Sequence, residues 1–191
     1  MTTGLVLDCD TGSDDAVAIM TAALHPELEL IALSTANGNV ALPNTLRVFS
    51  AGIRDSVVIP LDATHSAPLT ATDCEEFDEF GTPAGTAASR LIRHRIEEQQ
   101  DDPAATAVPV HDALCIAYLV RPDVITDSGS YHVDVETGGD RTLGQMIVDT
   151  RPWSTAPVTA TVAMAASADV YREVLRDALR NDAKAEVSGL R

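Results

Sequence analysis

The sequence LVLDCDTGSDDAVAIM spans residues 5–20 and places four aspartates between two apolar runs. The first run, residues 5–7, is typical of a buried β-strand, and residues 16–24 have the pattern of a helix. The turn between these two elements therefore follows the carboxyl end of a strand. Open α/β sheets hold their ligands at that end, so this turn is the first candidate for a functional site.

The four aspartates are Asp8, Asp10, Asp14 and Asp15, and they lie within eight residues of one another. Like charges at such spacing repel and raise one another's pKa unless a cation neutralises them. Carboxylate oxygens favour a hard cation, Ca²⁺ or Mg²⁺, over zinc. The sequence thus predicts a divalent-cation site near the N-terminus.

Helix capping and an EF-hand calcium loop account for the acidic turn less well. Acidic residues are common at the start of a helix, but capping uses one or two of them rather than four. An EF-hand calcium loop needs Gly at its sixth position and Glu at its twelfth. Counted from Asp8, those positions hold Ser13 and Ile19, which excludes an EF-hand.

Composition limits the classes of protein to which the chain can belong. With 191 residues and 45% hydrophobic content, the chain is long enough to form one domain with a sizeable core. A formal charge of −16 argues against nucleic acid or an anionic membrane surface as a partner, because both would repel it. No apolar stretch approaches the length of a membrane span, and no signal sequence precedes the first strand, so we expect a cytoplasmic protein.

Strand and helix patterns alternate along the chain, which predicts an α/β fold with an open, mostly parallel sheet flanked by helices. We expect the acidic segment from residue 68 to residue 79 to be solvated surface. The expected strands after the first are residues 28–34, 57–61, 131–136, 143–148 and 158–165, and the expected helices are residues 16–24, 42–53, 87–100, 113–120 and 169–179.

Four motifs occur in the order seen in nucleoside hydrolases. They are Asp8–Ala16, Asn37–Asn39, Leu61–His65 and Val110–Asp112. On these motifs the chain resembles the inosine-uridine-preferring members of that family. The resemblance implies a nucleoside-hydrolase-like sheet and hydrolysis of the N-glycosidic bond of ribonucleosides to free base and ribose, in purine and pyrimidine nucleoside catabolism. Because this bond breaks through an oxocarbenium-like transition state, the site must activate water, stabilise the positive sugar and assist the leaving base.

The resemblance also implies a cofactor and its ligands. By similarity, Asp10, Asp15 and Asp112 would bind Ca²⁺, and Asp10 would also take a proton from the attacking water as the catalytic base. The spacing alone does not give this ligand set, and Asp112 by itself is typical of a helix-capping residue.

The substrate contacts carried over from the family involve further residues. Asp14 and Asn39 would hold the ribose hydroxyls, and Asp112 would lie against the substrate as well as the metal. His111 matches the candidate general acid for the leaving base, a task that its near-neutral pKa suits. Taken without the family match, His111 is more typical of a surface or helix-end histidine.

The chain departs from the family in its middle. The family has a long segment there, which supplies central strands, a backbone carbonyl to calcium and ribose-binding residues. Here residues 53–56 lead almost directly into residue 57, so we interpret residues 1–191 as a single nucleoside-hydrolase-like domain with an internal deletion near residues 54–57. Glu76-Phe77-Asp78 superficially matches the ribose motif but lies on the wrong side of residues 61–65.

This deletion has consequences for folding and for activity. The first strand could pair directly with residues 57–61, or two chains could cover each other's exposed surfaces in a homo-oligomer. Loss of ribose contacts would impair catalysis, since rate depends on interactions that strengthen in the transition state.

Two alternatives to a nucleoside hydrolase stay open. One is a non-catalytic relative that binds calcium or a nucleoside, or a deletion product without selected function. The other is a haloacid-dehalogenase-like phosphohydrolase, which also begins with a strand followed by Asp-x-Asp. A phosphohydrolase leaves Asp15 and His111 unexplained, and the chain has no convincing late motif to hold its Mg²⁺.

Overall fold

A parallel βαβ unit opens the fold. The computed structural model describes residues 2–9, 12–35, 56–98, 106–142 and 145–181. β1 (Thr3–Cys9) pairs in parallel with β2 (Leu28–Thr35), and α1 (Ser13–Leu24) connects them. This unit confirms the first strand, helix and strand expected from the sequence, and it brings the acidic turn to the carboxyl end of β1.

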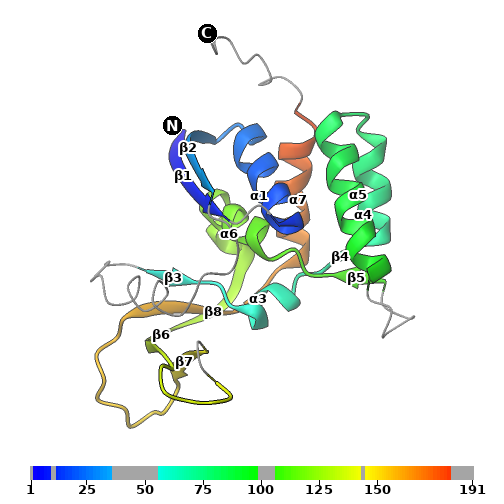
Figure 1. Cartoon of the computed structure of the whole chain (residues 1–191). Helices are drawn as coiled ribbons and strands as arrows, with labels where there is room; N and C mark the ends of the chain where they lie inside the picture. Colours follow the sequence, from blue (N-terminus) through cyan, green and yellow to red (C-terminus); the bar gives the residue numbers. More distant parts are fainter. Residues whose placement is uncertain (1, 10–11, 36–55, 99–105, 143–144, 182–191) are drawn as a thin grey trace.

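Four further helices pack with α1 around the main hydrophobic core. They are α4 (Ala71–Glu79), α5 (Pro83–Glu98), α6 (His111–Val120) and α7 (Ala168–Leu179). Figure 1 shows α4 and α5 standing side by side, with α7 between this pair and α1. Fully buried side chains from all of these helices meet in one cluster with the inner side chains of β1 and β2. The predicted α/β class with flanking helices is confirmed.

A second sheet lies beyond the helices, in the lower part of Figure 1. Its strand order is β3 (Val57–Val58), β8 (Ala160–Ala166), β6 (Ile125–Val135) and β7 (Met146–Asp149). β3 runs parallel to β8, whereas β6 is antiparallel to both β8 and β7. The expectation of mainly parallel strands therefore holds for β1 with β2 and β3 with β8, and the C-terminal strands add antiparallel pairs.

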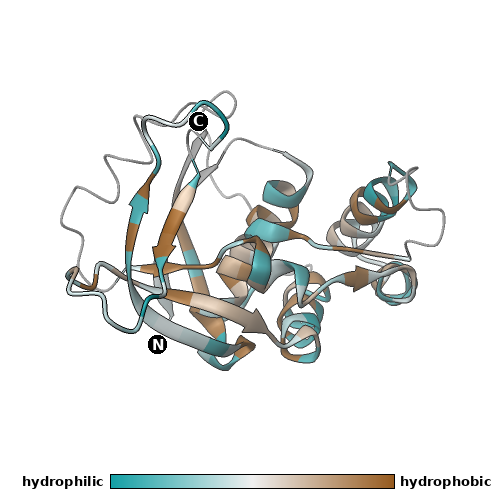
Figure 2. Cartoon of the chain, turned by 90° about the horizontal axis from the view of Figure 1, so that it is seen from below, coloured by the Kyte–Doolittle hydropathy of each residue, from teal (hydrophilic) through white to brown (hydrophobic). Residues whose placement is uncertain are grey.

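Short elements connect these layers. A small antiparallel pair joins β4 (Leu69–Thr70) to β5 (Ala107–Val108), and the one-turn η1 (Pro122–Val124) leads from α6 into β6. Figure 2 shows hydrophobic and hydrophilic segments alternating along the strands at the left of that view. Val133, Ala160 and Val162, on β6 and β8, form a separate small hydrophobic cluster of the second sheet. None of the helices in the described ranges is long and apolar enough to cross a membrane.

The strand expected at residues 57–61 is wrong beyond its first two residues. β3 ends at Val58, and α3 (Leu61–His65) begins after Pro60. Proline has no N–H to donate to a sheet, and the Pro60 carbonyl accepts the first helical bonds from Ala63 and Thr64. The polar residues 62–65 at the end of this segment therefore lie on a short helix and not on a strand.

The solvated segment expected at residues 68–79 is also wrong. Most of it forms α4, whose Cys74 and Phe77 are fully buried. Acidic residues of the same helix pair with arginines of α7: Glu76 with Arg176 at 2.8 Å, and Asp73 with Arg172 at 2.9 Å. The acidic composition hid an amphipathic helix whose charges are matched by a neighbour distant in sequence.

The pairing of β1 with residues 57–61, one of the two alternatives that the sequence left open, is not found in the described part of the chain. There β1 pairs with β2, and β3 pairs with β8. The helix expected at residues 42–53 lies outside the described residues.

Candidate metal and catalytic site

Three carboxylates converge where α1 and α6 begin. One oxygen from each of Asp14, Asp15 and Asp112 lies within 4.8 Å of the others, and we call these three residues the acidic cluster. Asp14 and Asp15 occupy the first turn of α1, and Asp112 the first turn of α6. The two helices pack against each other, so residues far apart in sequence share one site.

Asp15 is the most buried member of the acidic cluster and has a structural task. Its Oδ2 accepts a hydrogen bond from the backbone N–H of Gly12 at 2.8 Å, which satisfies one of the free donors at the start of α1. Helix capping thus accounts for Asp15. It does not account for the two other carboxylates beside it.

The residues present fit a divalent cation. Helix N-termini attract negative charge, but that effect amounts to about half a charge for each helix and cannot balance three carboxylates. An all-oxygen donor set suits Ca²⁺ or Mg²⁺ rather than zinc. Among the described residues, Asp15 and Asp112 would hold such an ion, and Asp14 lies directly beside them.

A cation of the protein itself also contacts this cluster. Nη1 of Arg95, on α5, lies 3.0 Å from Oδ2 of Asp14, and both side chains are largely shielded from solvent. No role for Arg95 could be predicted from the sequence, because the position of a single arginine on a charged helix does not indicate which residue it pairs with.

His111 is the first residue of α6 and lies beside the acidic cluster. Its Nδ1 is 2.7 Å from Oγ1 of Thr64, and its ring centroid is 5.6 Å from that of His65. The Thr64 hydroxyl also donates to the carbonyl of Leu61 at 3.1 Å. With the single hydroxyl proton used there, the matching tautomer of His111 donates from Nδ1–H to Thr64 and leaves Nε2 as the acceptor nitrogen.

The pKa of His111 is lowered from its ordinary value. Burial is the main cause, and the positive charge of Arg95 and the neighbouring His65 add to it, while Asp14 opposes them. The neutral imidazole is therefore the resting form near pH 7.

A buried tyrosine of α7 contacts the N-terminal end of α6. Tyr171 of α7 is fully buried and donates its hydroxyl to the carbonyl of Val110 at 2.9 Å. Burial raises the pKa of Tyr171 well above its ordinary value, so the hydroxyl stays protonated as a donor. Val110 precedes His111 and Asp112, so this bond fixes the backbone that presents both side chains.

The structure brings together four of the six residues predicted for the site. Asp14, Asp15, His111 and Asp112 lie in one place, and Asp10 and Asn39 lie outside the described residues. Thr64, Arg95 and Tyr171 were missed. The Leu61–His65 motif pointed to the neighbourhood of Thr64, whereas Tyr171 has the sequence pattern of an ordinary core residue.

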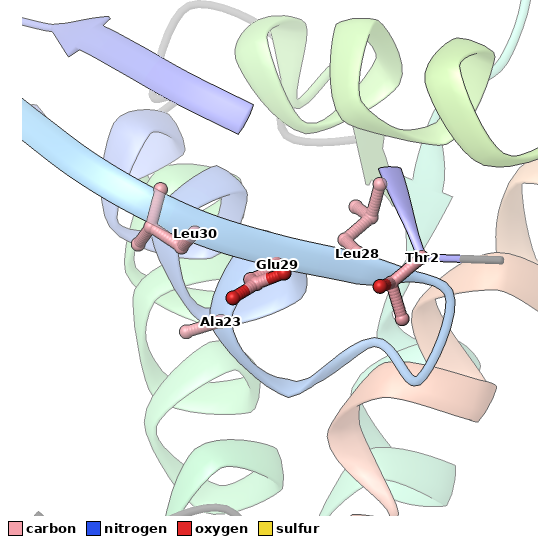
Figure 3. Close-up of a pocket in the computed structure, with 5 residues that line it drawn as sticks. All are labelled: Thr2, Ala23, Leu28, Glu29 and Leu30. Carbon is pink, nitrogen blue, oxygen red and sulfur yellow. The ribbon is translucent and has the colours of Figure 1, made fainter. Parts of the chain in front are cut away.

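A separate hollow lies at the other end of β1 and β2. Figure 3 shows it lined by Thr2, Ala23, Leu28, Glu29 and Leu30, at the amino ends of the two strands. The acidic cluster follows the carboxyl end of β1, so this hollow does not belong to the candidate site.

Comparison with known proteins supports a single family. The family model described as inosine-uridine preferring nucleoside hydrolase matches residues 5–51 and 46–173. Pyrimidine-specific ribonucleoside hydrolase RihA of Salmonella paratyphi B is 36% identical over 103 residues, and RihA of Citrobacter koseri is 37% identical over the same length. Each match covers 53% of this chain but only 32% of the relative.

Solved structures share the fold at low sequence identity. A purine-preferring ribonucleoside hydrolase from Gardnerella vaginalis superposes with a TM-score of 0.74 at 16% identity, covering 93% of this chain and 98% of that one. The plant nucleoside hydrolase PpNRh1 superposes with a TM-score of 0.73 at 15% identity, covering 94% of this chain and 99% of that one.

Proposed function

The chain belongs to the inosine-uridine preferring nucleoside hydrolase family, and from this membership we propose that it hydrolyses the N-glycosidic bond of ribonucleosides to free base and ribose. The observation that carries the proposal is the acidic cluster at the start of α1 and α6 with His111 beside it. Those residues match the family's motifs and come together only through the fold.

Each residue of the site has a separate task in this reaction. Asp14 and Asn39 would accept hydrogen bonds from the ribose hydroxyls and so fix the sugar. Asp10 would take a proton from the attacking water, and His111 in its protonated form would pass the proton on Nε2 to the departing base. The negative charge of the site would stabilise the positive sugar of the transition state.

We propose Ca²⁺ as the cofactor, held by Asp10, Asp15 and Asp112. When bound, the ion would acidify the attacking water and orient it. The support for this is the oxygen-only donor set of Asp14, Asp15 and Asp112.

We also propose that the chain is a single domain with an internal deletion near residues 54–57 and that its catalysis is impaired. The family model matches in two separate segments, residues 5–51 and 46–173, whose junction lies a few residues before this place. The stretch matched to the curated relatives spans about a third of their length. Ribose contacts that the family takes from its middle segment would then be absent, which weakens transition-state binding. A relative that binds calcium or nucleoside without turnover is the second candidate, favoured by the same short coverage.

Release of free ribose from a panel of purine and pyrimidine ribonucleosides tests the proposal. The panel needs both classes of base, because the relatives' names include pyrimidine-specific and purine-preferring enzymes. We expect slow release with Ca²⁺, none with a chelator, and none from Asp10→Asn or Asp112→Asn. Asp169→Asn, an exposed carboxylate on α7, is the matched control and should retain full activity.

The outcomes separate the two candidate functions. Calcium-dependent release that the site variants abolish supports a hydrolase. Calcium binding by the folded chain with no ribose release from any nucleoside overturns hydrolysis and favours the binding relative.

A further inference from the structure

Arg95 contacts the candidate site but has no role in the proposed reaction. It lies on α5, yet its guanidinium reaches across to α1 and pairs with Asp14 at 3.0 Å. The side chains of Arg95 and Asp14 are only 25% and 19% exposed, so solvent screens this pair less than a surface pair. A neighbouring arginine, Arg93, pairs instead with Asp78 of α4, at 3.4 Å.

The negative charges of the acidic cluster outnumber the positive charge that Arg95 brings to it. The cluster carries three negative charges when its carboxylates are ionised, and Arg95 places one positive charge against Asp14. Arg95 therefore offsets part of the negative charge that a divalent cation would meet at this cluster. A long guanidinium side chain held at low exposure loses much conformational freedom, so its placement here needs a compensating electrostatic gain.

We propose that Arg95 is a positioning residue that serves as the built-in counter-ion of the acidic cluster. By pairing with Asp14 it keeps that carboxylate away from the cation and available to substrate hydroxyls, and its own charge lowers the affinity of the cluster for divalent cations. The effect on cation affinity rests on the proposed calcium site. The stabilisation of the cation-free cluster rests only on the ion pair between Arg95 and Asp14.

Two consequences follow when the charge of residue 95 is removed. Asp14 becomes free to join the ligands of a cation, and one repelling positive charge disappears, so we expect Ca²⁺ to bind about tenfold more tightly. Without a cation, Asp14 loses the positive charge of Arg95 while two other carboxylates still lie beside it, so the chain should unfold at a lower temperature.

Calorimetric titration of Ca²⁺ into the chelator-treated full chain tests the first consequence. The variants are Arg95→Met and Arg95→Gln, which remove the charge, Arg95→Lys, which keeps it, and Arg93→Met as the control from the same helix. We expect tighter binding in both neutral variants and no change beyond twofold in Arg95→Lys and Arg93→Met. Equal or weaker binding in the neutral variants overturns the proposal, as does an equal gain in Arg95→Lys.

Thermal unfolding in chelator at low salt tests the second consequence and needs no bound cation. Both neutral variants should unfold at a lower temperature than Arg93→Met, and added salt should narrow the gap. An equal or higher unfolding temperature overturns the counter-ion role. A wild-type chain that binds no Ca²⁺ contradicts the calcium part of the proposed function instead, and the unfolding comparison then decides the role of Arg95 by itself.

Discussion

The two faces of the β1–β2 sheet are covered unequally. On one face Leu5 and Leu7 pack against the main core, and Leu28 is 1% exposed. On the other face Val6 is 65% exposed and Ile31, whose side chain lies against Gly4, is 67% exposed. Parallel sheets are almost always covered on both faces. This sheet has apolar side chains on both faces, but only one face is buried.

The candidate site is supported from the buried face of this sheet. The covered face rests on α1 and the helices around it, and these helices present the acidic cluster and His111. The open face is where a segment lost from the middle of the chain would have its largest effect, since the family takes central strands from that segment. The described part of the chain contains the helices that support the carboxylates.

The largest effect is expected from a cavity on the covered face. Leu28→Ala should lower the free energy of unfolding by about 2–5 kcal/mol, because it removes a fully buried side chain from the main core. Urea unfolding measured by circular dichroism gives this value. A loss below about 1 kcal/mol would show that the covered face is not tightly packed.

Calcium is expected to act through the same face, at the carboxyl end of β1. At Ca²⁺ concentrations one hundred times its Kd, the wild-type free energy of unfolding should rise by about 2.7 kcal/mol over that in chelator. Asp112→Asn should lose this rise, and Asp169→Asn should keep it. An identical rise in Asp112→Asn would place the calcium-binding residues elsewhere.

A smaller effect is expected from the hydroxyl that supports α6. Tyr171→Phe removes the hydrogen bond to the Val110 carbonyl and should cost about 1 kcal/mol of unfolding free energy. Tyr118→Phe, a half-buried tyrosine on α6, controls for the loss of a hydroxyl in itself. Equal costs in the two variants would mean that the Val110 contact adds nothing to the stability of the site.

The sequence predicted the helices and strands better than it predicted which of them contact one another. Periodicity located α1, α6, α7 and β8 within a few residues, because each element has its own apolar pattern. It failed at α4, where acidic residues suggested solvent, since the arginines that match them lie about one hundred residues later. Local composition carries no information on pairs that only the tertiary structure creates.

The same division applies to the site. Asp14, Asp15, His111 and Asp112 belong to motifs of the family and could be named from sequence, and the fold brings them together. Arg95 and Tyr171 act through contacts made across helices, and no local pattern marks them. The carboxylates were therefore predictable, whereas the groups that set their charge balance and position were not.

The smallest effect is expected on the open face, and it completes the comparison with Leu28. Ile31→Ser exchanges an exposed apolar side chain for a polar one, so the free energy of unfolding should change by no more than about 0.5 kcal/mol. Aggregation on heating, followed by light scattering, should decrease, because exposed apolar surface and an open sheet promote association. A loss of stability close to that of Leu28→Ala would show that Ile31 is covered in solution, and the two faces of the sheet would then be equivalent.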